Sequence, residues 1–222
     1  MFYYKWKKYI NDNIEIVPLE LKGRGKRIDQ KFSLSMKAVV DDLYQELISY
    51  LDAESDKPYA LFGHSMGSTI VFELAHKLQE EKVNAPVHLF FSGGYPPEYN
   101  YCIKRIHDIS PEAFKEEILS MGVTPIEIFE NESLASIFVP ILRADYKVLE
   151  EYTYVEYDKK LSCDISVFYG LKDRKNNDTL LFSWLGYSTG ETKFYSFDSG
   201  HFFVIDCMER VVETVNSILM SI

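Results

Sequence analysis

The stretch GHSMG at residues 63–67 limits the possible folds of this chain more than any other feature, because of the sequence on either side of it. The apolar residues 59–62 before it predict a short strand, and residues 68–78 after it predict an amphipathic helix. A G-x-S-x-G pattern between a strand and a helix is typical of a strained turn that exposes its serine, with both glycines leaving room for the turn. The five residues alone also fit an ordinary tight turn whose serine caps the helix. The flanking strand and helix favour an exposed Ser65.

Ser65 is predicted to be a catalytic nucleophile, and a serine hydroxyl needs a neighbouring base to act as one. In a site of this kind the acid and then the histidine follow the serine along the chain. His201 fits that order, because it lies in a loop after the predicted strand 193–197, beside Gly200, which gives the backbone freedom to aim it. A structural role is the alternative for His201. The other histidines fall in the turn, the next helix, the next strand and early in the middle of the chain (His64, His76, His88 and His107).

Asp173 is the predicted acid that orients the imidazole of His201. It follows the predicted strand 165–170 in a short loop, so its carboxylate is expected at the carboxyl end of that strand. Asp198 is close to His201 in sequence and remains a competitor. Two other aspartates are expected to cap a helix and to precede the strand (Asp178 and Asp164, respectively). The backbone N–H of Met66, at the start of the helix, is the predicted donor to an oxyanion.

Strands and helices alternate along most of the chain, and this predicts a single α/β domain over residues 1–222 with a mostly parallel sheet and helices on both faces. The expected strands are 14–21, 59–62, 87–92, 165–170 and 193–197, and the expected helices are 35–51, 68–78, 180–185 and 206–221. The middle, about 96–157, reads as a helical insertion that would form a lid. Its first helix is expected to begin at Ser110-Pro111 and stop at Gly122, and its second to cover 132–155.

The net charge of −10 argues against a general nucleic-acid binder, because phosphate contacts need clustered lysine and arginine. The charge is uneven, since residues 1–31 hold eight basic and four acidic residues. This segment fits either a solvated basic face or a docking surface for an acidic partner.

The three cysteines, Cys102, Cys163 and Cys207, are far apart and form no CxxC. They are expected to be reduced thiols of a cytoplasmic protein, with no disulfide framework and no metal site. No run is long enough to span a bilayer, and the N-terminus lacks the apolar stretch of an export signal. We therefore expect no membrane partner, and we expect a monomer.

The chain resembles the type II thioesterases that accompany nonribosomal peptide and polyketide synthases, which have the α/β-hydrolase fold. The resemblance rests on six segments in the family's order: LELKGRGKR (19–27), LFGHSMGSTIVFELA (61–75), FFSGGYPPE (90–98), PILRADYKVLEEY (140–152), YGLKD (169–173) and SGHFF (199–203). It implies hydrolysis of acyl groups from the phosphopantetheine arm of carrier proteins, an editing role without a cofactor of the enzyme's own. It also implies a triad of Ser65, His201 and Asp173, and a helical lid over the acyl chamber.

Carrier proteins are commonly acidic, so charge reversal of lysine and arginine within 22–31 is expected to slow hydrolysis of carrier-bound acyl groups more than that of a small thioester. The GRG at 23–25 lacks the full pattern of a phosphate-binding loop and is interpreted as a turn. Two alternatives remain for the function: a serine carboxylesterase or lipase acting on free esters, and a noncatalytic carrier-binding homologue.

The start of the chain departs from the family pattern, which begins with an apolar strand and a loop resembling F-P-H-A-G-G. The opening MFYYKWKKYI resembles the helix that follows that loop, so the N-terminal strand and the second oxyanion N–H are expected to be missing. A missed upstream start, a fragment and a truncated, impaired variant are the three explanations. Each predicts an open edge or gap beside the strand at 59–62.

Overall fold

The computed structural model describes residues 2–53, 57–102, 104–122, 124–173 and 178–222. The chain divides into two compact units. The first, here called the sheet unit, comprises Met1–Leu19, Leu43–Pro97 and Glu156–Ile222; the second, the helical unit, comprises Glu20–Asp42 and Glu98–Val155. The predicted insertion at about 96–157 thus supplies most of the helical unit, which also takes in residues 20–42. A lid function for the helical unit stays a prediction.

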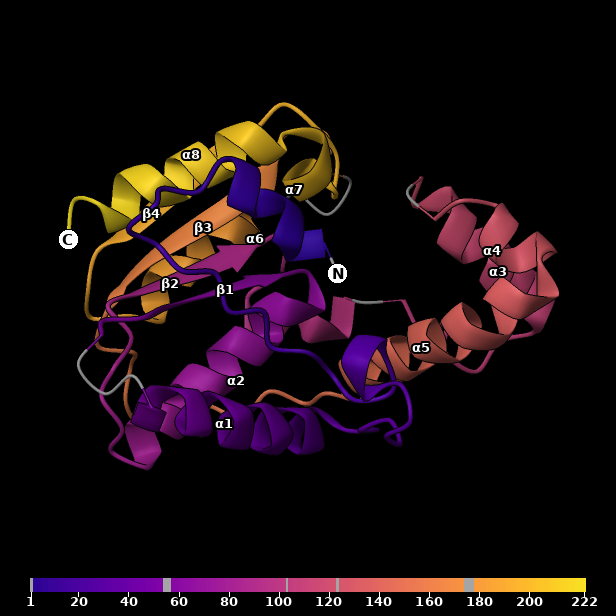
Figure 1. Cartoon of the computed structure of the whole chain (residues 1–222), viewed down its shortest axis with the longest axis horizontal. Coiled ribbons are helices and arrows are strands. Elements are labelled where there is room, and N and C mark those ends of the chain that lie inside the picture. Colours follow the sequence, from indigo (N-terminus) through magenta and orange to yellow (C-terminus); the bar gives the residue numbers. More distant parts are fainter. Residues whose placement is uncertain (1, 54–56, 103, 123, 174–177) are drawn as a thin grey trace. The chain divides into compact units, whose positions relative to one another are not determined.

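Four parallel strands form the sheet in the order β1-β2-β3-β4 (Figure 1). Their bounds are Ala60–His64 for β1, His88–Ser92 for β2, Asp164–Gly170 for β3 and Thr192–Phe197 for β4. These strands and the α/β class are confirmed. Within the described sheet β1 is an edge strand. This agrees with the open edge that was expected beside the strand predicted at 59–62. Because the strands are parallel, the residues that follow β1, β3 and β4 all lie at one edge of the sheet.

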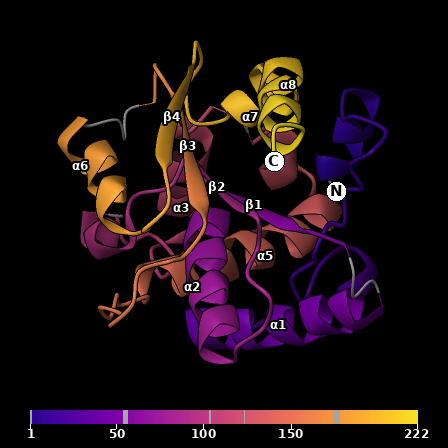
Figure 2. The ribbon, with the colours of Figure 1, turned by 90° about the vertical axis from the view of Figure 1, so that its left-hand side faces the viewer.

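Alternating aromatic side chains bury both faces of the sheet, since successive residues of a strand point to opposite sides. Phe90 and Phe168 belong to a core cluster with Trp6 and with residues of the C-terminal helices. On the other face Phe91 stacks on Trp184 with ring centroids 4.3 Å apart. Figure 2 shows α6 (Asp178–Phe182) and α8 (Met208–Leu219) on opposite sides of the strands. The helices of this unit are η1 Phe2–Lys8, α2 Met66–Glu80, α6 Asp178–Phe182, η4 Ser183–Gly186, α7 Phe203–Asp206 and α8 Met208–Leu219.

The strand predicted at 14–21 is wrong, because these residues form no strand. A strand is stabilised by ladder hydrogen bonds, and β1 pairs only with β2 in the described sheet. Pro18 lacks an N–H and cannot contribute to such a ladder. The apolar alternation of this segment instead packs partly buried side chains against the core, as Ile16 does.

The helical unit contains η2 Gly25–Arg27, α3 Pro111–Ser120, α4 Glu127–Glu130 and α5 Glu132–Glu150, while η3 Pro97–Cys102 and α1 Met36–Ala53 run across the boundary of the units. The predicted start of α3 is confirmed, because the Ser110 hydroxyl accepts a hydrogen bond from the N–H of Ala113. Gly122 adopts a φ of +80°, which suits glycine just beyond a helix end. The second helix ends at Glu150, five residues before the predicted end at 155. Ile106, Phe114 and Ile118 form a buried hydrophobic cluster in the helical unit.

None of the helices in the described ranges combines the length and apolar character that a bilayer crossing requires. Cys163 and Cys207 are free thiols, and burial raises the pKa of Cys163 to about 11. The side chain of Cys102 lies outside the described residues.

His76 in α2 is buried and stacks face to face on Tyr157, with ring centroids 3.7 Å apart. Burial lowers the pKa of His76 from 6.5 to about 4. The unfolded chain therefore binds a proton at His76 below pH 6.5 that the folded chain takes up only near pH 4. Because of this difference, the free energy of unfolding should fall by about 3 kcal/mol as the pH decreases from 6.5 to about 4.

The measurement is urea unfolding of the wild type and of a His76→Phe variant at pH 7 and near pH 4.5. Phenylalanine keeps a ring against Tyr157 and cannot titrate. Between the two pH values, the free energy of unfolding of the variant is expected to fall by about 2–3 kcal/mol less than that of the wild type. Parallel losses in both proteins would contradict the assignment.

Candidate active site

Ser65 is the single residue between β1, which ends at His64, and α2, which begins at Met66. Its φ of 56° and ψ of −117° lie outside the regions that residues with a side chain usually adopt. Such a backbone costs about 1–3 kcal/mol and persists only where its surroundings hold it. The prediction of a strained strand–turn–helix serine is confirmed.

The two glycines that flank the serine are not equivalent. A Cβ on Gly63 would lie 2.0 Å from the carbonyl oxygen of Gly67, so only glycine fits where the strand passes the helix start. A Cβ on Gly67 would meet none of the described atoms outside its own helix turn within 4 Å. The expected need for a small residue is therefore confirmed at Gly63, whereas at Gly67 the described structure leaves room for a Cβ.

Two further serines, which the sequence reasoning missed, hold the turn in place. The Ser65 N–H donates to the carbonyl oxygen of Ser92 at 2.7 Å. Ser68 is fully buried, and its hydroxyl accepts from the Ser92 N–H at 2.9 Å while lying 3.0 Å from the carbonyl oxygens of Gly63 and Ser92. This hydroxyl therefore ties the ends of β1 and β2 to the start of α2. The sequence held one indication of the role of Ser92, because this residue ends the strand predicted at 87–92 and such an end lies beside the serine turn.

The structure brings together the three residues predicted for the triad. The Nε2 of His201 lies 3.0 Å from the Ser65 hydroxyl, and its Nδ1 lies 2.7 Å from a carboxylate oxygen of Asp173. The side chains of His201 and Asp173 are only 16% and 6% exposed. An ionised carboxylate can only accept, so Nδ1–H donates to Asp173 and Nε2 is left to accept from Ser65. This tautomer is the one that can take the serine proton.

Backbone hydrogen bonds join the loops that carry the histidine and the acid. The N–H of Leu171 donates to the carbonyl of Phe197 at 2.8 Å, and the N–H of Lys172 donates to that of Ser199 at 2.9 Å. A Cβ on Gly170 would lie 2.3 Å from the carbonyl oxygen of Gly200, so the close approach requires a glycine in β3. Gly200, which was expected to give the backbone freedom to aim His201, is not among the described glycines with a positive φ, so its backbone does not use the left-handed region that favours glycine.

Two of the competing aspartates have other partners. Asp198 is 72% exposed and pairs with Lys172 at 2.9 Å. Asp164, at the amino end of β3, accepts from the N–H of Glu191 at 2.7 Å. Helix α6 begins at Asp178, as predicted, and the side chain of that residue lies outside the described part of the chain. Among the aspartate side chains that the structure describes, Asp173 is the one that hydrogen-bonds with His201.

The other histidines have different partners. His88 is buried, and its Nε2 lies 2.8 Å from the hydroxyl of Ser166 in β3. His107, in the helical unit, pairs through Nδ1 with the carboxylate of Glu150. No three His, Cys, Asp or Glu side chains in the described ranges are placed to hold a metal ion together.

His64 is the residue nearest to the triad that the sequence reasoning set aside. Its ring centroid lies 5.1 Å from that of His201, and its Nδ1 lies 2.9 Å from the hydroxyl of Ser92. The hydroxyl of Tyr3 hydrogen-bonds with the backbone of His64. Burial raises the pKa of Tyr3 to about 12, and this hydrogen bond opposes the shift only in part. Helix η1 is therefore fixed to the strand residue that precedes the nucleophile.

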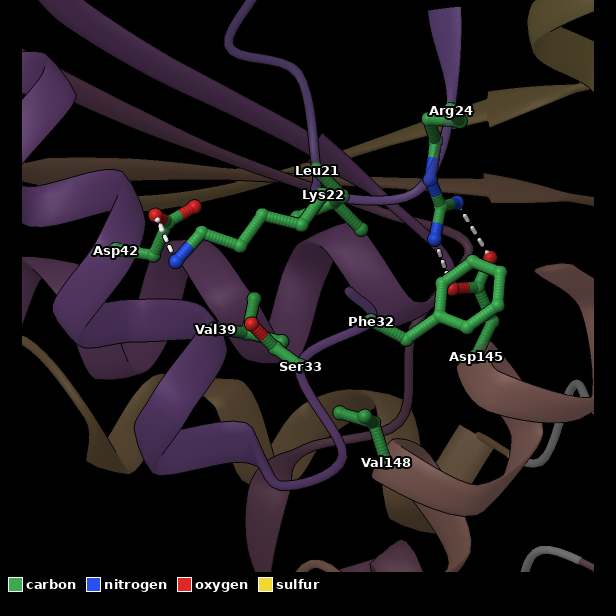
Figure 3. Close-up of a pocket in the computed structure, with 9 residues that line it drawn as sticks. All are labelled: Leu21, Lys22, Arg24, Phe32, Ser33, Val39, Asp42, Asp145 and Val148. Carbon is green, nitrogen blue, oxygen red and sulfur yellow. Dashed lines mark hydrogen bonds and ion pairs between the residues drawn. The ribbon is translucent and has the colours of Figure 1, made fainter. Parts of the chain in front are cut away.

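The GRG turn lies in the helical unit, where its Arg24 lines a small hollow (Figure 3). Gly23 and Gly25 have φ values of +78° and +50°, and the turn interpretation is confirmed. Between them, Arg24 donates two hydrogen bonds to the carboxylate of Asp145, at 2.7 and 2.6 Å. Lys22 pairs with Asp42 at 2.8 Å. Lys22 and Arg24 are already paired with carboxylates, so these cations are better suited to stabilising the helical unit than to binding a phosphate.

Comparisons with known proteins agree with this geometry. A family model described as "Thioesterase domain" matches residues 1–219. The chain is 33% identical over 208 residues to the medium-chain S-acyl fatty acid synthase thioesterase of Anas platyrhynchos, covering 92% of this chain and 80% of that protein. It is 28% identical over 211 residues to the gramicidin S biosynthesis protein GrsT of Aneurinibacillus migulanus, covering 95% and 80%.

Two solved structures extend the likeness to the fold. ClbQ, from the colibactin NRPS/PKS pathway, is 38% identical with a TM-score of 0.92, covering 99% of this chain and 91% of that one. The type II thioesterase BorB, from the borrelidin biosynthetic cluster, is 25% identical with a TM-score of 0.82, covering 97% and 86%. The parallel sheet with its serine turn is that of the α/β-hydrolase fold. The chain belongs to the thioesterase family of serine hydrolases.

Proposed function

We propose that this protein is an editing thioesterase that hydrolyses acyl groups from the phosphopantetheine arm of carrier proteins in nonribosomal peptide or polyketide synthesis. The observation that carries the proposal is the hydrogen-bonded series Ser65, His201 and Asp173 at a strained turn. The family match and the synthase pathways named for GrsT, ClbQ and BorB support the substrate class. The substrate brings the phosphopantetheine, so the proposed reaction needs no cofactor of the enzyme.

In the first half of the proposed reaction, the Ser65 oxygen attacks the thioester carbonyl carbon while its proton passes to Nε2 of His201. Asp173, bonded to Nδ1–H, stabilises the imidazolium that forms. The Met66 N–H at the start of α2 has no partner in the preceding turn and is suited to donate to the new oxyanion. Collapse of the tetrahedral intermediate breaks the C–S bond, and the imidazolium returns its proton to the departing thiolate.

In the second half, water attacks the carbonyl carbon of the acyl-Ser65 ester. His201 takes a proton from this water and then gives it to the Ser65 oxygen as the ester bond breaks. The products are the free acid and the regenerated serine. The same imidazole thus serves both halves, as its position between hydroxyl and carboxylate allows.

The test compares each acyl group in two forms, a carrier-bound thioester and a soluble ester, at equal concentration. We expect a higher kcat/KM on the carrier-bound thioester for both acetyl and octanoyl groups. Equal or faster hydrolysis of the soluble esters would favour a carboxylesterase instead. The measurement is release of free carrier thiol against release of alcohol.

A fluorophosphonate probe separates the noncatalytic alternative from both enzymes, because it reacts only with an activated serine. Labelling of the wild type, lost in Ser65→Ala, is expected. A folded wild-type protein that binds a carrier and stays unlabelled would make the chain a noncatalytic carrier-binding homologue.

A further inference from the structure

The basic residues near the start of the chain fall into two groups with different surroundings. Three of those in 22–31 are engaged within the helical unit: Lys22 and Arg27 pair with Asp42, and Arg24 pairs with Asp145. These ion pairs remove much of the charge that a docking surface at 22–31 would offer to an acidic partner.

The second group lies on η1 in the sheet unit. Lys5, Lys7 and Lys8 are exposed, the helix has no acidic residue in its first turn, and these three lysines are here called the lysine face. Lys8 donates to the Tyr9 hydroxyl. Among the described residues, no carboxylate lies within ion-pair distance of Lys5 or Lys7. On a chain with a net charge of −10, the lysine face is a local positive surface.

The opposite side of η1 is fixed beside the nucleophile. Trp6 is buried, and its ring packs edge-on against Phe62 of β1 with centroids 4.7 Å apart. Tyr3 packs against the same ring at 6.0 Å and hydrogen-bonds with the backbone of His64. The lysine face is therefore carried by an element that contacts the strand residues just before Ser65.

We propose that the lysine face is the surface on which an acidic carrier domain docks, with its acidic side chains against Lys5 and Lys7. Charge complementarity identifies the partner: an acidic protein surface gains from these ammonium groups, which no described carboxylate neutralises, whereas like charge over the rest of this acidic chain would repel it. The Lys7 ammonium lies 5.7 Å from the centroid of the Tyr4 ring, a contact that leaves its charge in place. The proposal rests on the proposed function, since the docked domain would present its thioester to Ser65. Docking through exposed charge should act on encounter and KM and leave kcat at saturation unchanged.

The experiment reverses charge in a Lys5→Glu/Lys7→Glu variant and measures hydrolysis of one acyl group on three leaving groups: a carrier protein, coenzyme A and N-acetylcysteamine. We expect kcat/KM on the carrier to fall by about tenfold or more, mainly through KM, and the other two to change less than about twofold. The loss should shrink when the salt concentration is raised, because exposed charges are screened.

A Lys159→Glu/Lys160→Glu variant is the matched control. Both lysines are exposed in the sheet unit, shortly before the amino end of β3 and thus at the edge of the sheet remote from Ser65. The control changes net charge by the same amount and is expected to keep its activity on the carrier. Equal losses in both variants, or no loss in either, would overturn the proposal. A loss on coenzyme A as large as that on the carrier would assign the lysines to the phosphate and also overturn it.

Binding separates failure of the docking proposal from failure of the proposed function. Affinity for the phosphopantetheinylated carrier is measured in a Ser65→Ala background with and without the lysine reversals. A wild type that fails to hydrolyse carrier-bound thioesters refutes the proposed function alone if this binding still depends on Lys5 and Lys7. If the wild type hydrolyses carrier-bound thioesters but the affinity for the carrier is unchanged by the reversal of Lys5 and Lys7, the docking surface alone is refuted.

Discussion

Replacing Ser65 with alanine is expected to lower kcat for thioester hydrolysis by roughly 10⁵- to 10⁶-fold, to the residual rate that binding alone supports. The Ser65 hydroxyl lies 3.0 Å from Nε2 of His201, and in the described site it is the group placed to attack and to pass its proton to that nitrogen. Alanine has a Cβ like serine, so the backbone of the turn and its strain are retained. The measurement is thiol release from an acyl carrier at saturation.

A Ser49→Ala variant controls for serine removal in general, because Ser49 is exposed on α1 and its hydroxyl donates to the carbonyl of Gln45 in the same helix. This control should retain wild-type turnover. Retention of more than about a hundredth of the activity by Ser65→Ala would show that another group is the nucleophile.

Replacing Asp173 with asparagine is expected to lower kcat by about 10⁴-fold while the fold is kept. The carboxylate accepts from Nδ1–H of His201 at 2.7 Å and thereby leaves Nε2 free to accept from Ser65. An asparagine amide can instead donate to Nδ1, which favours the tautomer that carries its proton on Nε2. That tautomer cannot take the serine proton.

Asp198→Asn is the matched control, since Asp198 was the competing candidate for the acid. It is 72% exposed and paired with Lys172, so its loss should change kcat by less than about twofold. A larger loss in Asp198→Asn than in Asp173→Asn would reverse the assignment. Thermal unfolding of both variants checks that the comparison reports on the site.

The residues of the candidate triad were predictable because each follows a strand with a strong local pattern. The apolar runs before Ser65, Asp173 and His201 predict strands that β1, β3 and β4 confirm. Parallel strands bring their carboxyl ends to one edge, so three segments far apart in the chain could be expected to meet. Their hydrogen-bonded order then follows from the chemistry of hydroxyl, imidazole and carboxylate.

Predictions that depended on an unseen neighbour succeeded less well. Residues 14–21 have strand-like alternation, yet a strand needs a paired backbone, and these residues form none. The close approach at Gly63 agrees with the expected need for small residues around Ser65, but the close approach at Gly170 was not expected. A close approach depends on which backbone passes nearby, and local sequence does not specify that.

The charged residues show the same division. The excess of lysine and arginine in residues 1–31 led to the prediction of a docking surface there, with charge reversal within 22–31 as its test. The partners of Lys22, Arg24 and Arg27 are Asp42 and Asp145, which lie too far along the chain for any local pattern to reveal. Once those pairs are seen, the exposed lysines of η1 become the better candidate for a docking surface.

The sequence by itself determined the α/β class, the serine turn and the candidates for the nucleophile, base and acid, because each depends on local periodicity and on residue chemistry. Only the tertiary structure decided that Ser68 and Ser92 hold the turn, that Gly170 admits the neighbouring loop, and which cations remain exposed. The physical reason is that hydrogen bonds, ion pairs and close approaches join groups distant in sequence. Their partners are fixed by the packing of strands and helices, and a one-dimensional pattern carries no record of that packing.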